Sequence, residues 1–181
     1  MLDIELSRPK VEDIERINEF FTIVLIDTFQ RNGISDLVDT FNEEINDKRR
    51  CLNQDFESGG KERHFLITKI KDKIVGSIEY GPSNELIVSC TNGELKEHVE
   101  IGTVFVHPDY QRKGIGRRMI DVILMELEKN AIEEFCLDSG YKSAQRIWMK
   151  KFGNPQYCLR DYWGKDSDHM VWRLRVKDEL K

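Results

Sequence analysis

The sequence predicts an α/β fold, a single domain in which strands and helices alternate along the chain. Three observations support this prediction. The 181 residues are close to the usual length of one domain. Hydrophobic residues make up 39% and charged residues 34%, as in a soluble globular protein. Strand and helix patterns follow one another in the order β-α-α-β-β-β-α-β-α-β-β, without a repeat or a linker between them.

Hydrophobic periodicity predicts the N-terminal elements. Residues 2–8, LDIELSR, alternate apolar and polar side chains, which indicates a half-buried strand ended by a proline. A helical pattern runs from residue 11 until an Asn-Gly pair at 32–33 interrupts it. A second helix is expected from residue 35, and Ser-Gly-Gly at 58–60 predicts the loop that follows it.

Three strands are predicted in the middle of the chain, and the last of them precedes the third helix. HFLITKI (64–70) and KIVGSIEYG (73–81) are separated by a two-residue turn, which predicts an antiparallel hairpin. HVEIGTVFV (98–106) is a strand ended by His-Pro. A strongly amphipathic helix follows from Ile115, with apolar side chains on one face.

The C-terminal elements complete the order. EFCLD (134–138) indicates a short buried strand, and residues 141–153 indicate a helix ended by Gly-Asn-Pro. QYCLRDYW (156–163) and HMVWRLRV (169–176) alternate on either side of a polar turn, 164–168, so they predict a terminal hairpin.

Charge and cysteine spacing exclude several functions. The formal net charge of -5 argues against general nucleic-acid binding, which needs a basic face. The four cysteines are scattered without a CxxC pair, so we predict no metal site and reduced, buried thiols in a cytoplasmic protein. The acidic start does not resemble a signal peptide, and no apolar run reaches the roughly 20 residues that span a membrane.

One stretch stands out from this acidic background: VHPDYQRKGIGRR, residues 106–118. It joins a predicted strand to a predicted helix, and the first turn of a helix has unpaired amides and a positive dipole end. Gly114 and Gly116 allow a ligand to approach the backbone, and Arg112, Lys113 and Arg117 add positive charge. The stretch therefore predicts a phosphate or pyrophosphate site.

Three phosphate-binding motifs compete for this stretch. A P-loop requires Lys-Ser/Thr after its last glycine, which is missing after Gly116. A dinucleotide fingerprint requires a third small residue where Met119 stands. The pattern Q/R-x-x-G-x-G/A is met by Gln111, Gly114 and Gly116. An ordinary strand-to-helix turn with exposed basic residues stays open as the alternative.

The chain resembles the GCN5-related N-acetyltransferase (GNAT) superfamily over nearly its whole length. The strand EIGTVFVHP, the turn DYQRKGIG and the helix RRMIDVILMELE resemble the acetyl-CoA motif of that family in order and spacing. LSRPKVEDIERI resembles the family's first strand and helix, and SAQRIWMKKFGN a diverged form of its later A-x-x-x-Y-x-x-x-G-F helix. The resemblance implies one domain over residues 1–181, with a mixed, mostly antiparallel sheet of about seven strands flanked by helices.

The resemblance also implies how a cofactor would bind. In the family, the strand before the turn splays from its neighbour, and its free backbone groups pair with the pantetheine arm. That implies Phe105 and Val106 beside the arm and Val104 near the thioester. The turn amides would hold the pyrophosphate, and a basic side chain of the turn would reach the 3′-phosphate. The cofactor-binding residues implied in the turn are Gln111, Arg112, Lys113, Gly114, Ile115, Gly116 and Arg117.

Acetyl transfer to an amine requires removal of a proton from the amine. Glu100 is six residues before Val106 on the same predicted strand, where some GNAT enzymes have a catalytic glutamate. The resemblance thus implies Glu100 as general base, with a surface glutamate as the alternative interpretation. Glu79 and His98 are alternative bases.

The usual general acid of the family is absent. The family often has a tyrosine four residues after the helix alanine, and here Trp148 is at that spacing after Ala144. Tyr157 is the candidate acid, with Tyr141 and Tyr162 as alternatives, and each of the three is also a plausible packing aromatic. A thiolate can also leave without an acid.

The acceptor side is less specified. The resemblance implies that residues 20–60 and 157–170 line it. The second segment combines aromatic side chains with carboxylates, a mixture that can bind a cationic amine, although a packed hairpin with a polar turn is the simpler interpretation. Residues 82–97 are expected to form a flap or an extra strand over the site, with 85–90 as that strand.

These observations predict an N-acetyltransferase that moves acetyl from acetyl-CoA to an amine of a small molecule or peptide by direct attack on the thioester. The expected partners are acetyl-CoA and the amine, with a homodimer as a candidate assembly, and neither nucleic acid nor membrane. A non-catalytic acyl-CoA-binding module of the same fold is the alternative. Nucleic-acid binding through QRKGIGRR is a third hypothesis, which the acidic net charge opposes.

Overall fold

A computed structural model describes residues 4–180 of the protein. The chain divides into two compact units. Unit 1 comprises the chain up to Tyr80 together with Thr103–Ile123, and unit 2 comprises Gly81–Gly102 together with the chain from Leu124 onward. The strand that precedes the basic turn therefore contributes its first half to unit 2 and its second half to unit 1. Each unit is described separately below.

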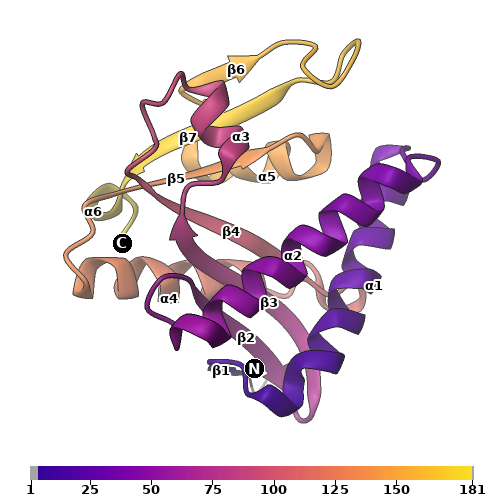
Figure 1. The fold of residues 1–181 in the computed structure, drawn as a ribbon, viewed down its shortest axis with the longest axis vertical. Coiled ribbons are helices and arrows are strands. Elements are labelled where there is room, and N and C mark those ends of the chain that lie inside the picture. Colours follow the sequence, from indigo (N-terminus) through magenta and orange to yellow (C-terminus); the bar gives the residue numbers. More distant parts are fainter. Residues whose placement is uncertain (1–3, 181) are drawn as a thin grey trace. The chain divides into compact units, whose positions relative to one another are not determined.

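Seven strands hydrogen-bond in the order β1-β2-β3-β4-β5-β7-β6 (Figure 1). The described partners are antiparallel for β1 with β2, β2 with β3, and β7 with both β5 and β6, while β4 and β5 are parallel. The predicted mixed, mostly antiparallel sheet is confirmed. The strands are β1 (Glu5–Ser7), β2 (His64–Ile70), β3 (Lys73–Pro82), β4 (Val99–Val106), β5 (Glu134–Ser139), β6 (Tyr157–Leu159) and β7 (His169–Arg175).

Unit 1 contains the first two predicted helices, α1 (Ile14–Asn32) and α2 (Val38–Ser58), after a short 3-10 turn, η1 (Val11–Asp13). The apolar residues of α1 recur at three- and four-residue spacing and form a buried stripe, which is why this segment is a helix covering a core. Gly33 ends α1 with a left-handed φ of 68°, so the predicted interruption is a C-cap. Part of the predicted first strand, residues 2 and 3, lies outside the described residues.

A buried carboxylate, Asp13, connects elements of unit 1. Asp13 is fully buried, and its oxygens accept hydrogen bonds from Lys69 Nζ at 2.8 and 3.0 Å, Arg16 Nη2 at 2.7 Å and the Lys10 amide at 3.0 Å. Burial alone would raise the pKa of Asp13, but the Lys69, Lys10 and Arg16 groups outweigh it and the pKa lies below its ordinary value. The helix start is thereby joined to β2.

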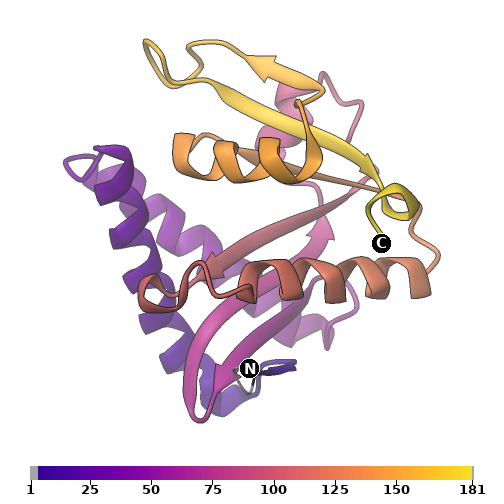
Figure 2. The ribbon, with the colours of Figure 1, turned by 180° about the vertical axis from the view of Figure 1, so that it is seen from behind.

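Unit 2 contains α3 (Glu85–Cys90), α5 (Lys142–Phe152) and α6 (Val176–Glu179). The two longer of these helices lie on opposite faces of β5 and β7, as the two views show (Figures 1 and 2). The pleat explains this, because alternate residues point to opposite faces. Phe135 contacts Phe152 of α5, whereas Cys136 belongs to a buried cluster with Ile87 and Leu95 on the α3 side.

The segment 85–90 is a helix, so the predicted strand there was wrong. The Asn84 side chain accepts a hydrogen bond from the Ile87 amide at 2.8 Å and caps the helix. Ile87 and Leu95 are fully buried against β5 and β7, and this packing overrides the strand propensity of the Ile-Val pair. Residues 91–94, which follow this helix, form a turn.

The last hairpin also differs from expectation. β6 is shorter than the predicted strand because residues 160–163 turn away from the ladder. The Asp161 amide donates to Asp168 Oδ1 at 2.9 Å, and the φ of Asp161 is 52°, so an Asp-built turn replaces the end of the strand. The remaining helix, α4 (Ile115–Lys129), begins in unit 1 and ends in unit 2. In residues 4–180 no helix is both long and apolar enough to cross a membrane.

Replacement of Asp13 by asparagine is expected to lower the free energy of unfolding by roughly 2–3 kcal/mol at neutral pH, since Lys69 and Arg16 lose their charged partner. A depressed pKa stabilises the fold fully above the ordinary value of 3.8, and this contribution is lost as the pH falls from there through the folded value. Urea unfolding at several pH values should therefore show the difference between the two proteins shrinking below about pH 4.

Glu12→Gln is the matched control, because the Glu12 side chain is 72% exposed and its contact with Lys10 is 3.9 Å long. Its effect should stay within about 0.5 kcal/mol. Equal effects of the two substitutions would contradict the role given to Asp13.

Candidate functional site

The basic turn begins where β4 ends. The turn and the second half of β4 lie in unit 1. Val104, Phe105 and Val106 are half-buried. Phe105 makes an edge-to-face contact with Phe21 of α1, with ring centroids 5.9 Å apart, so α1 fixes the side chains next to the backbone of β4. The His107 amide donates to the carbonyl of Val75 at 2.9 Å, which holds the end of β4 to β3.

A bend at Thr103 precedes these three residues. Its φ of 48° is unusual for a β-branched residue, so the surrounding structure must hold it. The Thr103 hydroxyl donates to Glu79 Oε1 at 3.3 Å, and its carbonyl accepts from the Ser77 hydroxyl at 2.9 Å. Two side chains of β3 thus hold the bend of β4 by hydrogen bonds.

Glu79, which accepts the hydrogen bond from the Thr103 hydroxyl, also belongs to a buried ion pair. Arg63 Nη1 donates to Glu79 Oε2 at 2.6 Å, and Arg63 Nε donates to Gln54 of α2 at 3.0 Å. The exposed fractions of the Arg63 and Glu79 side chains are 8% and 2%. Both oxygens of Glu79 therefore have structural hydrogen-bond partners. This argues against Glu79 as the alternative general base.

The turn itself has two left-handed residues, Arg112 with φ 59° and Gly114 with φ 82°. Such alternation aims successive backbone amides in one direction, the geometry of an anion-binding nest. The Gln111 side chain holds the start of the turn by two hydrogen bonds. Its nitrogen lies 3.2 Å from the Val106 carbonyl and 3.4 Å from Asp27 Oδ2 of α1. Composition and spacing did not reveal the contact with Asp27, since it depends on packing between distant segments.

The helix that follows presents its free amides at the same place. The first intrahelical bond of α4 runs from the Arg118 amide to the Gly114 carbonyl, at 3.0 Å, so the amides of Ile115, Gly116 and Arg117 precede it. Ile115 is buried and anchors the first turn. The structure thus brings the predicted turn residues and the helix start together into one concave run of donors.

Two basic side chains of the turn, Lys113 and Arg117, lie beside these backbone amides. Lys113 Nζ donates to the Asp109 carbonyl at 2.8 Å and lies 4.9 Å from the centre of the Tyr110 ring. The Arg117 side chain is 81% exposed, and its closest acidic partner, Asp121, is 3.9 Å away. Lys113 is therefore held by the turn, whereas the charge of Arg117 is exposed to solvent.

His107 adds no charge at neutral pH. Burial lowers the pKa of its imidazole, and Lys73 lowers it further, while Asp109 and Asp27 only partly oppose them. The neutral ring uses Nδ1 as an acceptor for the Asp109 amide, at 3.3 Å, and caps the short 3-10 turn η2 (Pro108–Tyr110). The histidine that ends the strand is thus a structural cap.

Glu100, the predicted base, is in unit 2. It is 7% exposed, and its two oxygens accept hydrogen bonds from the Asn84 amide at 2.8 Å and from Asn84 Nδ2 at 2.9 Å. Glu100 pairs with Cys136 in the parallel ladder of β4 and β5, and within unit 2 this ladder ends there although β5 continues to Ser139.

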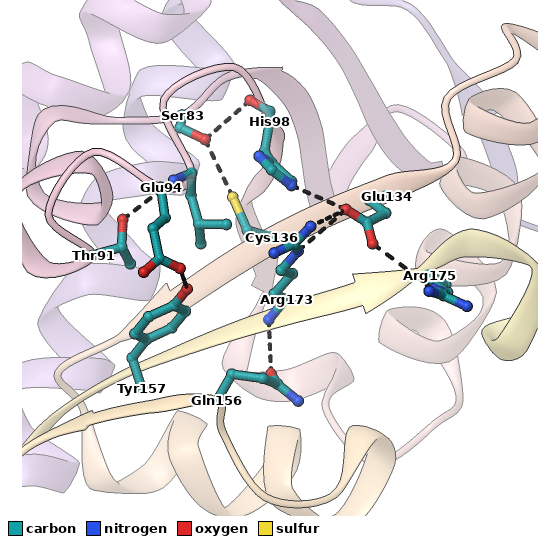
Figure 3. A network of polar contacts seen from close by, with 11 residues as sticks. Ser83, Thr91, Glu94, His98, Glu134, Cys136, Gln156, Tyr157, Arg173 and Arg175 are labelled. Atoms are coloured by element: carbon teal, nitrogen blue, oxygen red, sulfur yellow. Dashed lines mark hydrogen bonds and ion pairs between the residues drawn. The ribbon is translucent and has the colours of Figure 1, made fainter.

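Two further candidates of unit 2, Tyr157 and His98, belong to a polar network (Figure 3). The Tyr157 hydroxyl donates to Glu94 at 2.6 Å, and this bond, together with burial, raises the pKa of Tyr157. His98 is 3.1 Å from Glu134, whose pKa is lowered first by Arg173 and then by His98. Figure 3 shows Tyr157 pointing to Glu94 and Glu134 surrounded by His98 and Arg173.

Trp148, at the position of the missing tyrosine, stacks on Phe152 with ring centroids 5.8 Å apart. It is a packing residue of α5 in this structure. Burial raises the pKa of the Cys136 thiol to about 12, so this thiol stays protonated and unreactive at neutral pH. In the described part of the chain, no three His, Cys, Asp or Glu side chains are grouped to hold a metal ion.

A family model matches most of the chain. Residues 23–153 match the family described as the acetyltransferase (GNAT) family. No curated protein matches the sequence.

Solved structures share the fold. A Desulfovibrio desulfuricans protein assigned to the GNAT family has a TM-score of 0.71 at 14% identity, covering 96% of this chain and 99% of that one. PaiA N-acetyltransferase of Thermoplasma acidophilum, in complex with coenzyme A, has a TM-score of 0.67 at 16% identity, covering 95% and 99%. YncA of Salmonella typhimurium, whose structure includes its cofactor acetyl-CoA, has a TM-score of 0.67 at 14% identity, covering 96% and 94%.

The two glycines of the turn allow a test that separates binding from folding. A Cβ at Gly116 would lie 3.6 Å from Val106 Cγ2, an ordinary contact, and Gly116 has no left-handed φ. Gly116→Val should therefore change the free energy of unfolding by less than about 1 kcal/mol, but lower CoA affinity at least about tenfold by filling the approach to the amides. Isothermal titration with CoA measures the affinity, and thermal unfolding measures the stability.

Gly116→Ala is the control, since the motif accepts alanine there, and its CoA affinity should stay within about threefold of the parent. Gly114 is less informative, because its φ of 82° strains any substitution. If Gly116→Val bound CoA as well as Gly116→Ala, the turn would not be the pyrophosphate site.

Proposed function

Because the chain belongs to the GNAT acetyltransferase family, we propose that it transfers an acetyl group from acetyl-CoA to the amine of a small molecule or peptide. The observation that supports this most directly is the run of backbone amides from Arg112 to Arg117, which contains two left-handed residues and ends before the first bond of α4. Acetyl-CoA is the only cosubstrate that the proposal needs, and no metal enters the reaction.

The proposed binding mode assigns one part of the cofactor to each segment of unit 1. The amides of residues 111–117 hold the pyrophosphate, and Arg112 or Lys113 reaches the 3′-phosphate. Backbone groups of Val104–Val106 pair with the pantetheine arm, with Val104 nearest the thioester. The bend at Thr103 supports this assignment, since it turns the backbone immediately before these three residues.

The proposed reaction is a direct transfer. The acceptor arrives as an ammonium ion and loses one proton to become a nucleophile. Its nitrogen attacks the thioester carbonyl carbon, a C–N bond forms, and the C–S bond breaks as the intermediate collapses. The thiolate leaves and takes up a proton, so the products are the acetamide, CoA and one released proton. The high pKa of Cys136 argues against an acetyl-cysteine intermediate at that residue.

Glu100 is the proposed base for the first proton. Asn84 donates one hydrogen bond to each oxygen of this carboxylate and so fixes its orientation. Tyr157 is the proposed donor to the thiolate. Its raised pKa keeps the phenol protonated, but its hydrogen bond to Glu94 must open before it can donate to sulfur.

The proposal is tested by mixing the protein with acetyl-CoA and a panel of amines and following thiol release, with CoA titration in parallel. Binding together with amine-dependent thiol release supports the proposal. Absence of CoA binding would overturn it. Binding without release from any amine would instead favour the non-catalytic acyl-CoA module.

Glu100→Gln should lower kcat at least about 100-fold and leave CoA affinity near that of the parent, because it removes a base and no cofactor contact. The substitution also disturbs Asn84, so Asn84→Ala is the matched control. That variant keeps the carboxylate but removes the helix cap, which should cost about 1 kcal/mol of stability and less than about tenfold in kcat. Equal losses of kcat in the two variants would make Glu100 a positioning residue that acts through α3.

A further inference from the structure

A buried histidine lies directly before the basic turn in unit 1. His107 is 7% exposed, and its backbone amide donates to the Val75 carbonyl of β3 at 2.9 Å. Its imidazole contacts the ring of Tyr110 edge to face, with ring centroids 5.6 Å apart. The backbone of this residue is therefore attached to β3, while its side chain packs within the short 3-10 turn η2.

The side chain of His107 has a structural role that depends on its protonation. Nδ1 accepts a hydrogen bond from the Asp109 amide at 3.3 Å, so the proton of the neutral ring is on Nε2. A protonated imidazole carries N–H groups at both nitrogens and cannot accept a hydrogen bond. Uptake of one proton at Nδ1 therefore removes the cap of η2.

Asp109 connects this cap to the backbone amides of the basic turn. Its amide is bound by His107, and its carbonyl accepts a hydrogen bond from Lys113 Nζ at 2.8 Å. Lys113 in turn lies between Arg112 and Gly114, the two left-handed residues of the turn. Movement of Asp109 would therefore disturb the segment whose amides are proposed to bind the pyrophosphate.

The protonated ring has another partner close by. Asp109 Oδ2 is 3.7 Å from His107 Nδ1, which is too long for a hydrogen bond. An imidazolium N–H forms a charge-assisted hydrogen bond with a carboxylate when the two groups approach. Protonation would thus replace the hydrogen bond from the Asp109 amide by one to the Asp109 carboxylate. Because both groups belong to one residue, this exchange requires that residue to move.

Three charged groups act on the imidazole. Lys73 of β3 disfavours the charged ring, whereas Asp109 of η2 and Asp27 of α1 favour it. Burial has the largest effect and acts in the same direction as Lys73, so the pKa of His107 lies below its ordinary value of 6.5. The ring is therefore neutral at about pH 7.5, and it takes up a proton as the pH falls below that ordinary value.

We propose that neutral His107 is a positioning residue for the basic turn, and that its protonation releases the turn and weakens CoA binding. This inference rests on the proposed acetyl transfer and adds to it the control of cofactor binding by pH. His107 acts through Asp109, whose amide it holds only while Nδ1 can accept a hydrogen bond. Because CoA binds better to the protein with the neutral ring, proton uptake and CoA binding oppose each other.

Titration calorimetry with CoA at about pH 7.5 and about pH 5.5 tests the proposal on the whole protein. His107→Asn is the matched variant, because an asparagine oxygen accepts the same capping hydrogen bond and does not titrate. Between the two pH values, the parent should lose about three- to tenfold more affinity than His107→Asn. The phosphates of CoA titrate equally in both experiments, so their effect cancels from this ratio.

Equal losses of affinity in the parent and in His107→Asn would overturn the proposal. Tighter binding by the parent at the lower pH would also overturn it, because the imidazolium would then attract the phosphates by its charge.

Lys73→Gln should shift the pH dependence and leave the cap in place. The ammonium group of Lys73 disfavours the imidazolium, so its removal should move the loss of CoA affinity to higher pH. Lys71→Gln is the control, since it removes an exposed lysine of the same β2–β3 hairpin, and it should shift the midpoint less. A shift to lower pH in Lys73→Gln would contradict the proposal.

A measurement without CoA separates this proposal from the proposed function. Nuclear magnetic resonance of the free protein follows the His107 ring and the amides of Asp109 and Lys113 as the pH is lowered, and all three should change with one midpoint. Amides that stay in place while the ring titrates, or a ring that stays neutral until the protein unfolds, would overturn the proposal. Failure of the parent to bind CoA at about pH 7.5 would instead count against the proposed function.

Discussion

The geometry of the candidate site depends on one residue held in an unfavourable conformation, Thr103. Its left-handed φ interrupts β4, and the Glu79 and Ser77 side chains of β3 hold it there by hydrogen bonds to its hydroxyl and its carbonyl. Glu79 can do so only because Arg63 balances its buried charge. Before the bend, β4 pairs with β5; after it, the backbone leads into the amides of the basic turn. One ion pair and two hydrogen bonds therefore set the direction of the strand on which the proposed cofactor site is built.

The buried carboxylates of the chain divide between structural and candidate chemical roles. Asp13, Asp55 and Glu79 each form an ion pair with at least one arginine or lysine within unit 1. Glu100 is the buried carboxylate to which a chemical role is assigned, and it accepts hydrogen bonds from the backbone amide and the side-chain amide of Asn84. The same hydrogen bonds hold Asn84, which caps α3. Glu100 therefore has a structural role as well as the chemical role proposed for it.

Local patterns were sufficient to predict most of the fold. Alternation and helical spacing placed all seven strands and the four main helices, because each has one buried face. They failed at 85–90, where burial against β5 and β7 determines the conformation of an Ile-Val segment. At the site, the glycines and basic residues revealed the turn, since an anion site needs backbone access and charge. The bend at Thr103 and the hydrogen bond from Gln111 to Asp27 depend on tertiary contacts, and spacing along the sequence has no signal for those.

The most direct measurement is amide hydrogen exchange of the whole protein with and without CoA. The amides of residues 112–117 precede the first bond of α4 and are expected to exchange fast in the free protein, whereas the Gln111 amide donates to the Pro108 carbonyl at 3.3 Å. If they bind the pyrophosphate, CoA should slow their exchange at least about tenfold, and the exposed amides of the turn at 160–168 should change far less. Slowed exchange elsewhere, with residues 112–117 unchanged at saturating CoA, would contradict the assignment of this turn as the cofactor site.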